Sequence, residues 1–587
     1  MKWLGSATRF LFFTGKGGVG KTSISTATAI ALADAGKRVL LVSTDAASNL
    51  DEMLNVRLSN HPQAVPGVQG LQLLNIDPEA AAQAYRQRVL DQMGSAASAE
   101  EKGRVREQLS GACTTEIASF DEFAELLADE HDQYDHLIFD TAPSGHTLRL
   151  LSLPGAWSGF LAANQQGASC LGPHSGLTLQ ATRFNKALAT LTNPALTSVV
   201  LVARPEASAL REAARTSVEL AALGLSHQRL IVNGVFRASV AEDPVAQALE
   251  AQGQAALASL PDALRGLPRD DVPLRAVDSV GLPALRALLS GEAPRASDRA
   301  VAKPTLAAKP LGSLVDDLSG QERGLIMVMG KGGVGKTTIA AALAIGLVAS
   351  GKRVHLSTTD PAAHLADTLR EQVPGLQVSR IDPKAETQKY VDKIVASRGA
   401  ALTAEEKALL LEDLRSPCTE EIAVFHAFSH LVAQARSGFV VLDTAPTGHS
   451  LLLMDAAGAY HRQMLGSVEK QSGRGVTLVT PLMRLQDADY TKVIVVALPE
   501  VTSVSQAATL QEDLRRAGIE PYAWVLNRSV LAANTTDPLL ASRMQGEFRQ
   551  IKRIQDGLAV NLFAIPFQTE PPVGVAALRG LLTRSSS

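Results

Sequence analysis

Cysteine is scarce in this sequence, charge is nearly balanced, and no long apolar run is present. Three cysteines in 587 residues cannot build a disulfide framework, which excludes the class of small disulfide-stabilised secreted proteins. The lack of a run of about 18 apolar residues predicts that the chain has no transmembrane segment of its own. A net charge of −3 gives no indication of a nucleic-acid partner. We therefore expect a cytoplasmic globular protein, long enough for two or more domains.

One eight-residue motif occurs twice. GKGGVGKT stands at 15–22 and again at 330–337, each time after a short apolar run and before an amphipathic stretch. Both copies match G-x-x-x-x-G-K-[ST], the phosphate-binding loop, whose glycines let backbone N–H groups turn toward phosphate oxygens. The helix that follows directs its positive end at the same anion. Residues 1–13 are accordingly interpreted as a first strand that leads into the loop rather than as a signal peptide.

The motif predicts two sites for ATP and Mg²⁺. Lys21 and Lys336 are expected to reach the β- and γ-phosphates, and Thr22 and Thr337 to coordinate Mg²⁺. The predicted nucleotide-binding residues of the loops are Gly15, Gly17, Gly18, Val19, Gly20, Lys21, Thr22 and Ser23, with Gly330, Gly332, Gly333, Val334, Gly335, Lys336, Thr337 and Thr338.

The duplication covers most of the chain. Alanine-rich segments ending in glycine follow both loops, at 23–36 and 338–351, and apolar strands ending in Asp come next, at 37–45 and 352–360. The alternation of strand and helix predicts an α/β fold with two tandem homologous domains. Each is expected to be a doubly wound, mostly parallel sheet flanked by helices, and the two to pack as a pseudo-twofold pair. Further matched segments are CTTEIA and CTEEIA from 113 and 418, LIFDTAPSGH and VVLDTAPTGH ending at 146 and 449, and SVVLVARPE and VIVVALPE from 198 and 493.

The boundary between the repeats is rich in Ala, Pro, Ser and Lys. We expect a first ATPase domain over 1–290, a linker over 291–320 and a second ATPase domain over 321–587. A compact surface loop on one domain is the alternative for the linker.

Two pairs of carboxylates accompany the loops. Asp140 and Asp443 end apolar strands and are predicted to act on Mg²⁺, although an Asp in that place can also be a structural cap. Asp45 and Asp360 follow the strand after the first helix, where a carboxylate can orient the attacking water or join the Mg²⁺ shell, or serve as an N-cap. The residues after this Asp differ, AASN in the first copy and PAAH in the second, so the two hydrolysis rates can differ.

Each loop also contains an early lysine, Lys16 or Lys331. It resembles the signature lysine of the deviant phosphate-loop ATPases, a class that includes the nitrogenase iron protein and the MinD/ParA proteins. That resemblance implies a catalytic lysine that reaches the nucleotide of the opposite half. Here both halves lie on one chain, so Lys16 would serve the second site and Lys331 the first, in the manner of an arginine finger.

Cys113 and Cys418 occupy equivalent repeat positions, while Cys170 has no counterpart in the second half. If the halves pack about a pseudo-twofold axis, equivalent residues near that axis face each other. His146 and His449 each lie six residues past the predicted Mg²⁺ carboxylate. Thiolates bind thiophilic ions and imidazole can complete such a site, but an isolated cysteine can equally be a small buried hydrophobe. Residue types alone leave both interpretations open.

Together the two deviant phosphate loops, the paired DTAP[ST]GH and CTxEIA segments and the third cysteine resemble ArsA, the catalytic ATPase family of arsenite pumps. The resemblance covers both halves in order. It implies an arsenite- or antimonite-stimulated ATPase in which As(III) or Sb(III) binds at the interface between the halves. It also implies adenine contacts from Asn233 and Asn527. The metalloid-binding residues implied are Cys113, Cys170, Cys418, His146, His449 and Ser416.

The same resemblance implies a membrane partner. In the family this is the ArsB efflux protein, so we expect peripheral association with the inner face of the membrane, and a metalloid-delivering chaperone is a further expected partner. The chain is expected to function as a monomer with an internal pseudo-dimer.

Three other functions share part of this pattern. ATPases of the Get3 type, which target tail-anchored membrane proteins, share the ATPase core and the DTAPTGH segment, but they are typically homodimers with a CxxC zinc clasp and a Met-rich groove. This chain has no CxxC and no Met-rich run. A MinD/ParA positioning ATPase would need a membrane-binding tail or a basic DNA-binding patch. A structural zinc site of three Cys and one His is the third alternative.

Overall fold

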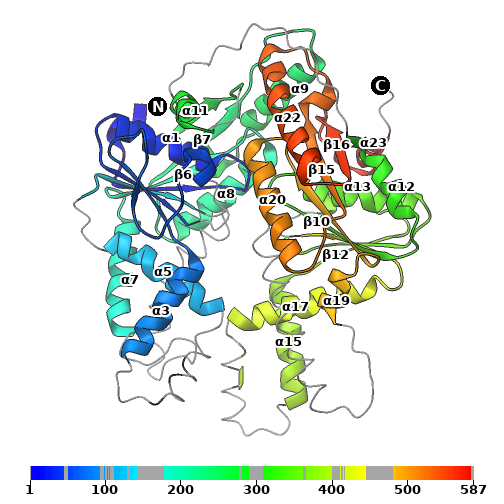
Figure 1. Ribbon diagram of the computed structural model, residues 1–587, viewed down its shortest axis with the longest axis horizontal. Coiled ribbons are helices and arrows are strands. Elements are labelled where there is room, and N and C mark those ends of the chain that lie inside the picture. The colour runs from blue at the N-terminus through cyan, green and yellow to red at the C-terminus, as the bar shows by residue number, and fades with distance from the viewer. Residues whose placement is uncertain are drawn as a thin grey trace. The chain divides into compact units, whose positions relative to one another are not determined.

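The computed structural model describes residues 2–44, 50–92, 98, 102, 105, 112–128, 133–141, 177–276, 280–289, 308–360, 365–398, 410–411, 414, 417–444 and 480–583. The chain divides into two compact units (Figure 1). Unit 1 comprises Met1–Ser239 and Leu249–Ser297, and unit 2 comprises Val240–Ala248 and Asp298–Ser587. A short segment of the first repeat therefore belongs to the second unit, which the sequence repeat does not predict.

Unit 1 contains an eight-stranded sheet in the order β3-β4-β2-β5-β1-β6-β7-β8. The register pairs are parallel except between β3 and β4, which run antiparallel. The central strand β1 lies between β5 and β6, so the chain crosses over the sheet in both directions from it, as in other doubly wound folds. The strands are β1 (Phe10–Thr14), β2 (Val39–Ser43), β3 (Gln63–Ala64), β4 (Leu71–Asn75), β5 (His136–Asp140), β6 (Thr197–Ala203), β7 (Gln228–Val235) and β8 (Arg269–Pro273).

Helices cover this sheet. Helix α1 packs on β1, β2, β4 and β5 and on α11, while α8 packs on β6 and α10. Helices α3, α5 and α7 lie side by side in Figure 1 and pack against one another in the order α3, α5, α7. The described helices from the first repeat are the 3₁₀ helix Lys2–Ser6, α1 (Lys21–Asp34), α2 (Leu50–Leu54), α3 (Pro78–Gln92), α5 (Ala112–Ala128), α7 (Leu177–Thr192), α8 (Ala207–Ala222), α9 (Pro244–Ala258), α10 (Asp262–Arg265) and α11 (Leu282–Leu289).

Unit 2 repeats the arrangement, with the strand order β12-β11-β13-β10-β14-β15-β16-β9 and parallel pairing throughout. Its strands are β9 (Lys309–Pro310), β10 (Gly324–Met329), β11 (Val354–Thr358), β12 (Leu376–Arg380), β13 (Phe439–Asp443), β14 (Thr491–Ala497), β15 (Ala523–Ser529) and β16 (Leu562–Pro566). Its described helices are α12 (Leu311–Ser319), α13 (Lys336–Ala349), α14 (Leu365–Leu369), α15 (Pro383–Arg398), α17 (Pro417–Gln434), α19 (Pro481–Gln486), α20 (Val501–Arg516), α21 (Val530–Ala533), α22 (Pro538–Gly557) and α23 (Val575–Gly580).

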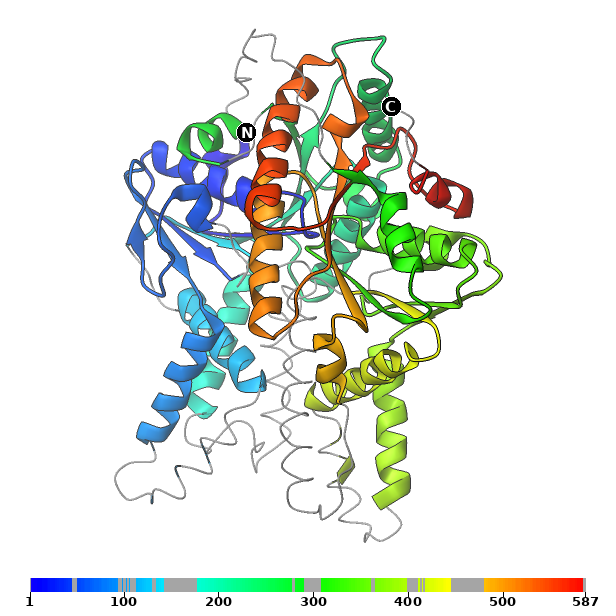
Figure 2. The same cartoon turned by 45° about the vertical axis from the view of Figure 1, so that its right-hand side comes forward.

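Strand β10 shows why the sheet must be covered on both faces. All six of its residues are buried. Ile326 and Val328 pack into the cluster formed with α12, α13 and α23, whereas Leu325 and Met327 pack into the cluster formed with α17 and α20. Because side chains alternate across a strand, a continuous apolar run requires a helical layer on each side. Figure 2 shows helices on both sides of the second sheet, and the predicted fold class is confirmed.

The expected linker, 291–320, ends in a folded helix. Helix α12 places Leu311, Leu314, Val315 and Leu318 in the core of unit 2, where each is at most 5% exposed. Strand β9, just before it, pairs with β16. Residues 308–320 therefore form part of the second domain and are not an exposed linker, because their apolar side chains recur at the helical spacing i, i+3, i+4, i+7. Residues 290–307 lie outside the described residues.

Candidate functional site: two phosphate-binding loops

Each phosphate loop joins the central strand of its sheet to the helix that follows. Gly20 and Gly335 are the N-caps of α1 and α13, and both adopt left-handed backbone conformations with φ of 90° and 96°. Glycine is needed here for a second reason. A Cβ at Gly335 would lie 2.2 Å from Nδ2 of Asn527, and one at Gly20 would lie 2.3 Å from Nδ2 of Asn233. Since glycine has no side chain, no side-chain cap occupies the N-terminus of either helix, and a helix N-terminus attracts anions.

The lysines of both loops fold back over their own loop. Nζ of Lys21 donates to the carbonyl oxygen of Lys16 over 3.3 Å, and Nζ of Lys336 donates to that of Lys331 over 3.2 Å. Lys21 and Lys336 are 6% and 5% exposed. The ammonium groups are thus held at the loops, where triphosphate oxygens are expected to bind. The signature lysines Lys16 and Lys331 are half-buried.

Asp443 and Thr337 form the centre of the predicted Mg²⁺ site in the second repeat. Oδ2 of Asp443 accepts hydrogen bonds from Oγ1 of Thr337 at 2.7 Å and from Oγ1 of Thr358 at 3.0 Å. Its other oxygen, Oδ1, is buried and accepts no hydrogen bond within the described part of the chain. Burial raises the pKa of Asp443 from 3.8 to about 6, opposed by the Lys336 ammonium and the Thr337 hydroxyl and reinforced by Asp360.

These oxygens suit Mg²⁺. A buried carboxylate oxygen without a hydrogen-bond donor, a threonine hydroxyl and a second carboxylate, Asp360, are the hard donors that this ion prefers. When bound, Mg²⁺ would neutralise charge on the β- and γ-phosphates. Thr358 was not predicted from the sequence. The strand register identifies it, because Thr358 on β11 lies opposite Asp443 on β13.

The first repeat has the same framework. Asp140 is fully buried at the end of β5, and Ser43 lies opposite it on β2, as Thr358 lies opposite Asp443. The backbone N–H of Thr44 donates to the Asp140 carbonyl oxygen over 3.0 Å, so the ends of these two strands are tied together. Thr22 lies at the second position of α1. Asp45 lies outside the described residues.

Asn233 and Asn527 contact the phosphate loops. Nδ2 of Asn233 donates to the carbonyl oxygen of Val19 over 2.9 Å, and Nδ2 of Asn527 donates to that of Val334 over 2.8 Å. Both asparagines lie on the strand two places from the central one, β7 or β15. These bonds brace the loops and were not predicted from the sequence. The adenine contact stays a prediction.

Two of the predicted metalloid ligands lie at equivalent points of the fold. Cys113 is the second residue of α5, and Cys418 is the second residue of α17. The structure describes the backbone at these cysteines but not their side chains. The other predicted ligands, Cys170, His146, His449 and Ser416, lie outside the described residues.

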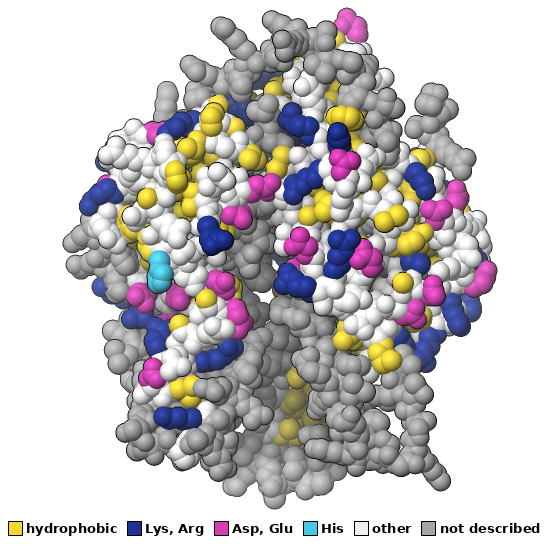
Figure 3. Space-filling model, viewed as in Figure 1, with side chains coloured by type: hydrophobic (Ala, Val, Ile, Leu, Met, Phe, Trp, Pro, Cys, Tyr) yellow, Lys and Arg dark blue, Asp and Glu magenta, His cyan; other side chains and the backbone are white. Residues whose placement is uncertain are grey.

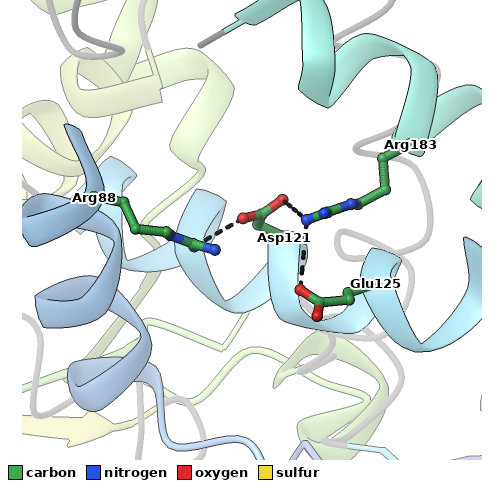
Figure 4. A network of polar contacts seen from close by, with 4 residues as sticks. All are labelled: Arg88, Asp121, Glu125 and Arg183. Atoms are coloured by element: carbon green, nitrogen blue, oxygen red, sulfur yellow. Dashed lines mark hydrogen bonds and ion pairs between the residues drawn. The ribbon is translucent and has the colours of Figure 1, made fainter. Parts of the chain in front are cut away.

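A buried aspartate further along α5 ties the Cys113 helix to its neighbours (Figure 4). Oδ2 of Asp121 lies 2.8 Å from Nη2 of Arg88 on α3, and Oδ1 lies 3.2 Å from Nη1 of Arg183 on α7. Glu125, one turn along α5, lies 3.5 Å from the same Arg183 nitrogen. The Asp121 side chain is 4% exposed, so these ion pairs are shielded from water on the aspartate side. In the second repeat the equivalent residue is His426, which stacks on Tyr390.

On the face drawn in Figure 3, Lys and Arg side chains are interspersed with Asp and Glu side chains over the described surface. Within the described residues, no helix is long and apolar enough to span a membrane.

Comparison with known sequences connects these sites to a family. The model of the family described as anion-transporting ATPase matches residues 8–290 and 323–485 of this chain, which include both phosphate loops. The chain belongs to the anion-transporting ATPase family. Its resemblance to ArsA is thereby confirmed, and it is an enzyme that hydrolyses ATP.

Two arsenical pump-driving ATPases align over nearly the full chain, and a third relative aligns over part of it. The chain is 50% identical over 587 residues to an arsenical pump-driving ATPase of Escherichia coli, covering 99% of this chain and 100% of that protein. It is 50% identical over 590 residues to an arsenical pump-driving ATPase of Acidiphilium multivorum, with the same coverage. The ATPase GET3 of Kluyveromyces lactis is 33% identical over 266 residues, which cover 40% of this chain and 75% of that protein.

Proposed function

We propose that this protein is a metalloid-stimulated ATPase that drives arsenite or antimonite efflux through a membrane pump. The observation that carries the proposal is its 50% identity, over 99% of the chain, to a protein named arsenical pump-driving ATPase. A relative such as GET3 aligns over only 40% of the chain. The matches to the arsenical pump-driving ATPases of Escherichia coli and Acidiphilium multivorum therefore include both repeats, whereas the match to GET3 does not.

In this proposal both phosphate loops bind Mg²⁺–ATP. Lys21 and Lys336 hold the phosphates, and Thr22, Asp45 and Asp140, with Thr337, Asp360 and Asp443, serve the two Mg²⁺ ions. Support comes from the glycine N-caps of α1 and α13, which provide no side-chain cap, and from the buried Asp443 oxygen. Lys16 and Lys331 act catalytically on the opposite nucleotide, and Asn233 and Asn527 contact adenine.

The metalloid would bind to Cys113, Cys170 and Cys418, with contributions from His146, His449 and Ser416. Support comes from the equivalent positions of Cys113 and Cys418, each in the first turn of its helix. A helix N-terminus favours the thiolate, which is the form that binds soft ions. Asp121 links the Cys113 helix to α3 and α7 through ion pairs, so a metalloid bond to this helix would also act on those two helices. The partners would be an ArsB-type pump, which the protein joins at the inner face of the membrane, and a metalloid-delivering chaperone.

ATP turnover measured against arsenite, antimonite, zinc and apolar helical peptides tests this function. We expect stimulation by arsenite or antimonite, and loss of that stimulation in the Cys113→Ser, Cys418→Ser double variant with basal turnover retained. Full stimulation of the double variant would exclude the paired cysteines as ligands. Stimulation by the peptides alone would favour the tail-anchored targeting function.

A second experiment tests the two ATP sites. Equilibrium binding should give two ATP per wild-type chain and one per chain in either single variant, Lys21→Ala or Lys336→Ala. We further expect each variant to lose nearly all metalloid-stimulated turnover, because each site depends on the other half. Retention of half of the stimulated rate would instead show independent sites.

A further inference from the structure

Asp243 comes from the first repeat but is buried in unit 2. Its side chain is 2% exposed, and the surrounding segment, Val240–Ala248, belongs to the second compact unit. Oδ1 accepts the backbone N–H groups of Val245 and Ala246 and so caps α9. Oδ2 faces residues from the far end of the sequence.

That second oxygen closes a loop of the second repeat. It accepts hydrogen bonds from Oγ1 of Thr535, from N and Oγ1 of Thr536, the latter at 3.1 Å, and from N of Asp537 at 2.9 Å. Burial raises the pKa of Asp243, but the hydrogen bonds from Thr535 and from the backbone outweigh it and hold the pKa well below its ordinary value. Asp243 is therefore an anion at neutral pH, held by donors from both repeats.

The loop that it closes, residues 528–537, follows Asn527, which braces the second phosphate loop, and includes the end of β15 and the short helix α21. Arg528, the residue after Asn527, has a φ of 61°, a left-handed backbone conformation that is strained for any residue other than glycine. The start of the loop is held by Glu547, whose oxygens accept from Oγ of Ser529 and from the N–H groups of Val530 and Leu531 at 2.9–3.0 Å. Glu547 is 6% exposed. Two buried carboxylates thus hold residues 528–537, one at each end.

The corresponding loop of the first repeat has different chemistry. Gly234 takes the position of Arg528 and adopts a φ of 85° without strain. There the N–H of Ala238 donates to Glu250, a residue of the same repeat. In the second loop, Glu547 of the same repeat likewise holds the start, and the carboxylate that holds the far end, Asp243, comes from the other repeat.

We propose that Asp243 is a positioning residue of the second nucleotide site, which holds the loop after Asn527 in place for the base of the nucleotide. The site at the second phosphate loop is then incomplete without a residue of the first repeat. This inference rests on the proposed nucleotide role of that loop and of Asn527. It gives the two sites unequal dependence on the segment Val240–Ala248.

Calorimetric titration of the full chain with Mg²⁺–ATP and Mg²⁺–GTP tests it in two backgrounds. Lys21→Ala leaves the second site for study, and Lys336→Ala leaves the first. Asp243→Asn places an amide NH₂ against backbone donors, so we expect it to weaken ATP binding about tenfold at the second site and less than about twofold at the first. We also expect the preference for ATP over GTP to fall at the second site only. Glu242→Gln, an exposed neighbour, is the matched control and should change neither site.

Thr535→Val gives an independent measure, because it removes one donor to Oδ2 and leaves the cap of α9 intact. We expect about threefold weaker ATP binding at the second site alone. Equal weakening of ATP binding at both sites would show a general loss of stability and overturn the inference. Unchanged ATP affinity at the second site in Thr535→Val would also overturn it, even if Asp243→Asn does not fold. Failure of the nucleotide assignment itself would appear separately, as an unchanged ATP stoichiometry in the two lysine variants.

Discussion

Gly335→Ala should destabilise the second phosphate loop much more than the same substitution at Gly351, which closes the same helix. Both glycines have positive φ, 96° and 78°. A left-handed backbone costs an alanine about 1–2 kcal/mol at either position. A Cβ at Gly351 meets nothing within 4 Å, whereas one at Gly335 would lie 2.2 Å from Nδ2 of Asn527. The difference between the two variants therefore isolates the contact with Asn527.

The size of that difference follows from the hydrogen bond that Asn527 loses. To make room, its amide has to leave the Val334 carbonyl oxygen, which it contacts at 2.8 Å, and Asn527 is 9% exposed. A buried polar group that loses its partner costs about 1–3 kcal/mol. We therefore expect Gly335→Ala to lower the free energy of unfolding by about 2–5 kcal/mol and Gly351→Ala by about 1–2 kcal/mol.

Urea-induced unfolding followed by circular dichroism measures both variants, and a double-mutant cycle with Asn527→Ala identifies the cause. Removing the amide removes the clash, so the double variant should be more stable than the sum of the single effects by about 1 kcal/mol. Gly20→Ala and Gly36→Ala repeat the comparison in unit 1. A Cβ at Gly20 would lie 2.3 Å from Nδ2 of Asn233, whereas one at Gly36 meets nothing within 4 Å. The reasoning is refuted if Gly335→Ala and Gly351→Ala agree within about 0.5 kcal/mol, or if the cycle is additive.

Two further predictions concern carboxylates. Asp121→Asn should lower the free energy of unfolding by about 1–3 kcal/mol, because two arginines lose the charge of a buried partner. Glu125→Gln, at an exposed carboxylate of the same network, should change it by less than about 0.5 kcal/mol. Thermal or urea-induced unfolding compares the two variants. Burial raises the pKa of Asp443 to about 6, so the folded protein binds this proton more tightly than the unfolded chain does. Without Mg²⁺, the contribution of Asp443 to stability should be present below about pH 4 and lost as the pH rises through about 6. Asp443→Asn should remove this dependence of the free energy of unfolding on pH, measured from about pH 4 to about pH 7. An unchanged pH dependence in the variant would contradict the assignment.

Much of the fold could be predicted from the sequence, because its elements carry local signals. The phosphate loops, the helices after them and the apolar strands ending at Asp140 and Asp443 stand where the repeat predicts them. Helix α12 carried a signal as well. Leu311, Leu314, Val315 and Leu318 have the spacing of a helix face, but the Pro- and Lys-rich residues before them favoured a linker.

The site was less predictable, because several of its contacts join residues that no local pattern relates. The lysines, the threonines and the strand-end carboxylates follow from the motif. Asp121 could not be recognised, since its partners Arg88 and Arg183 come from two other helices. Asp243 reads locally as an ordinary N-cap before a proline, which it also is. Its second role depends on Thr535 and so appears only in three dimensions.

The contact between Asp243 and Thr535 also sets an order of events during synthesis. The two residues are 292 positions apart. At about 5–20 residues per second, about 15–60 s of translation separate them. Asp243 can cap α9 at once, since its donors Val245 and Ala246 follow directly. Its other oxygen gains its hydrogen-bond donors only after most of the second repeat has been made. A nascent chain that stops short of Thr535 therefore contains the complete first repeat with the Asp243 carboxylate only half satisfied, and residues made late in the second repeat complete a contact begun before the midpoint of the chain.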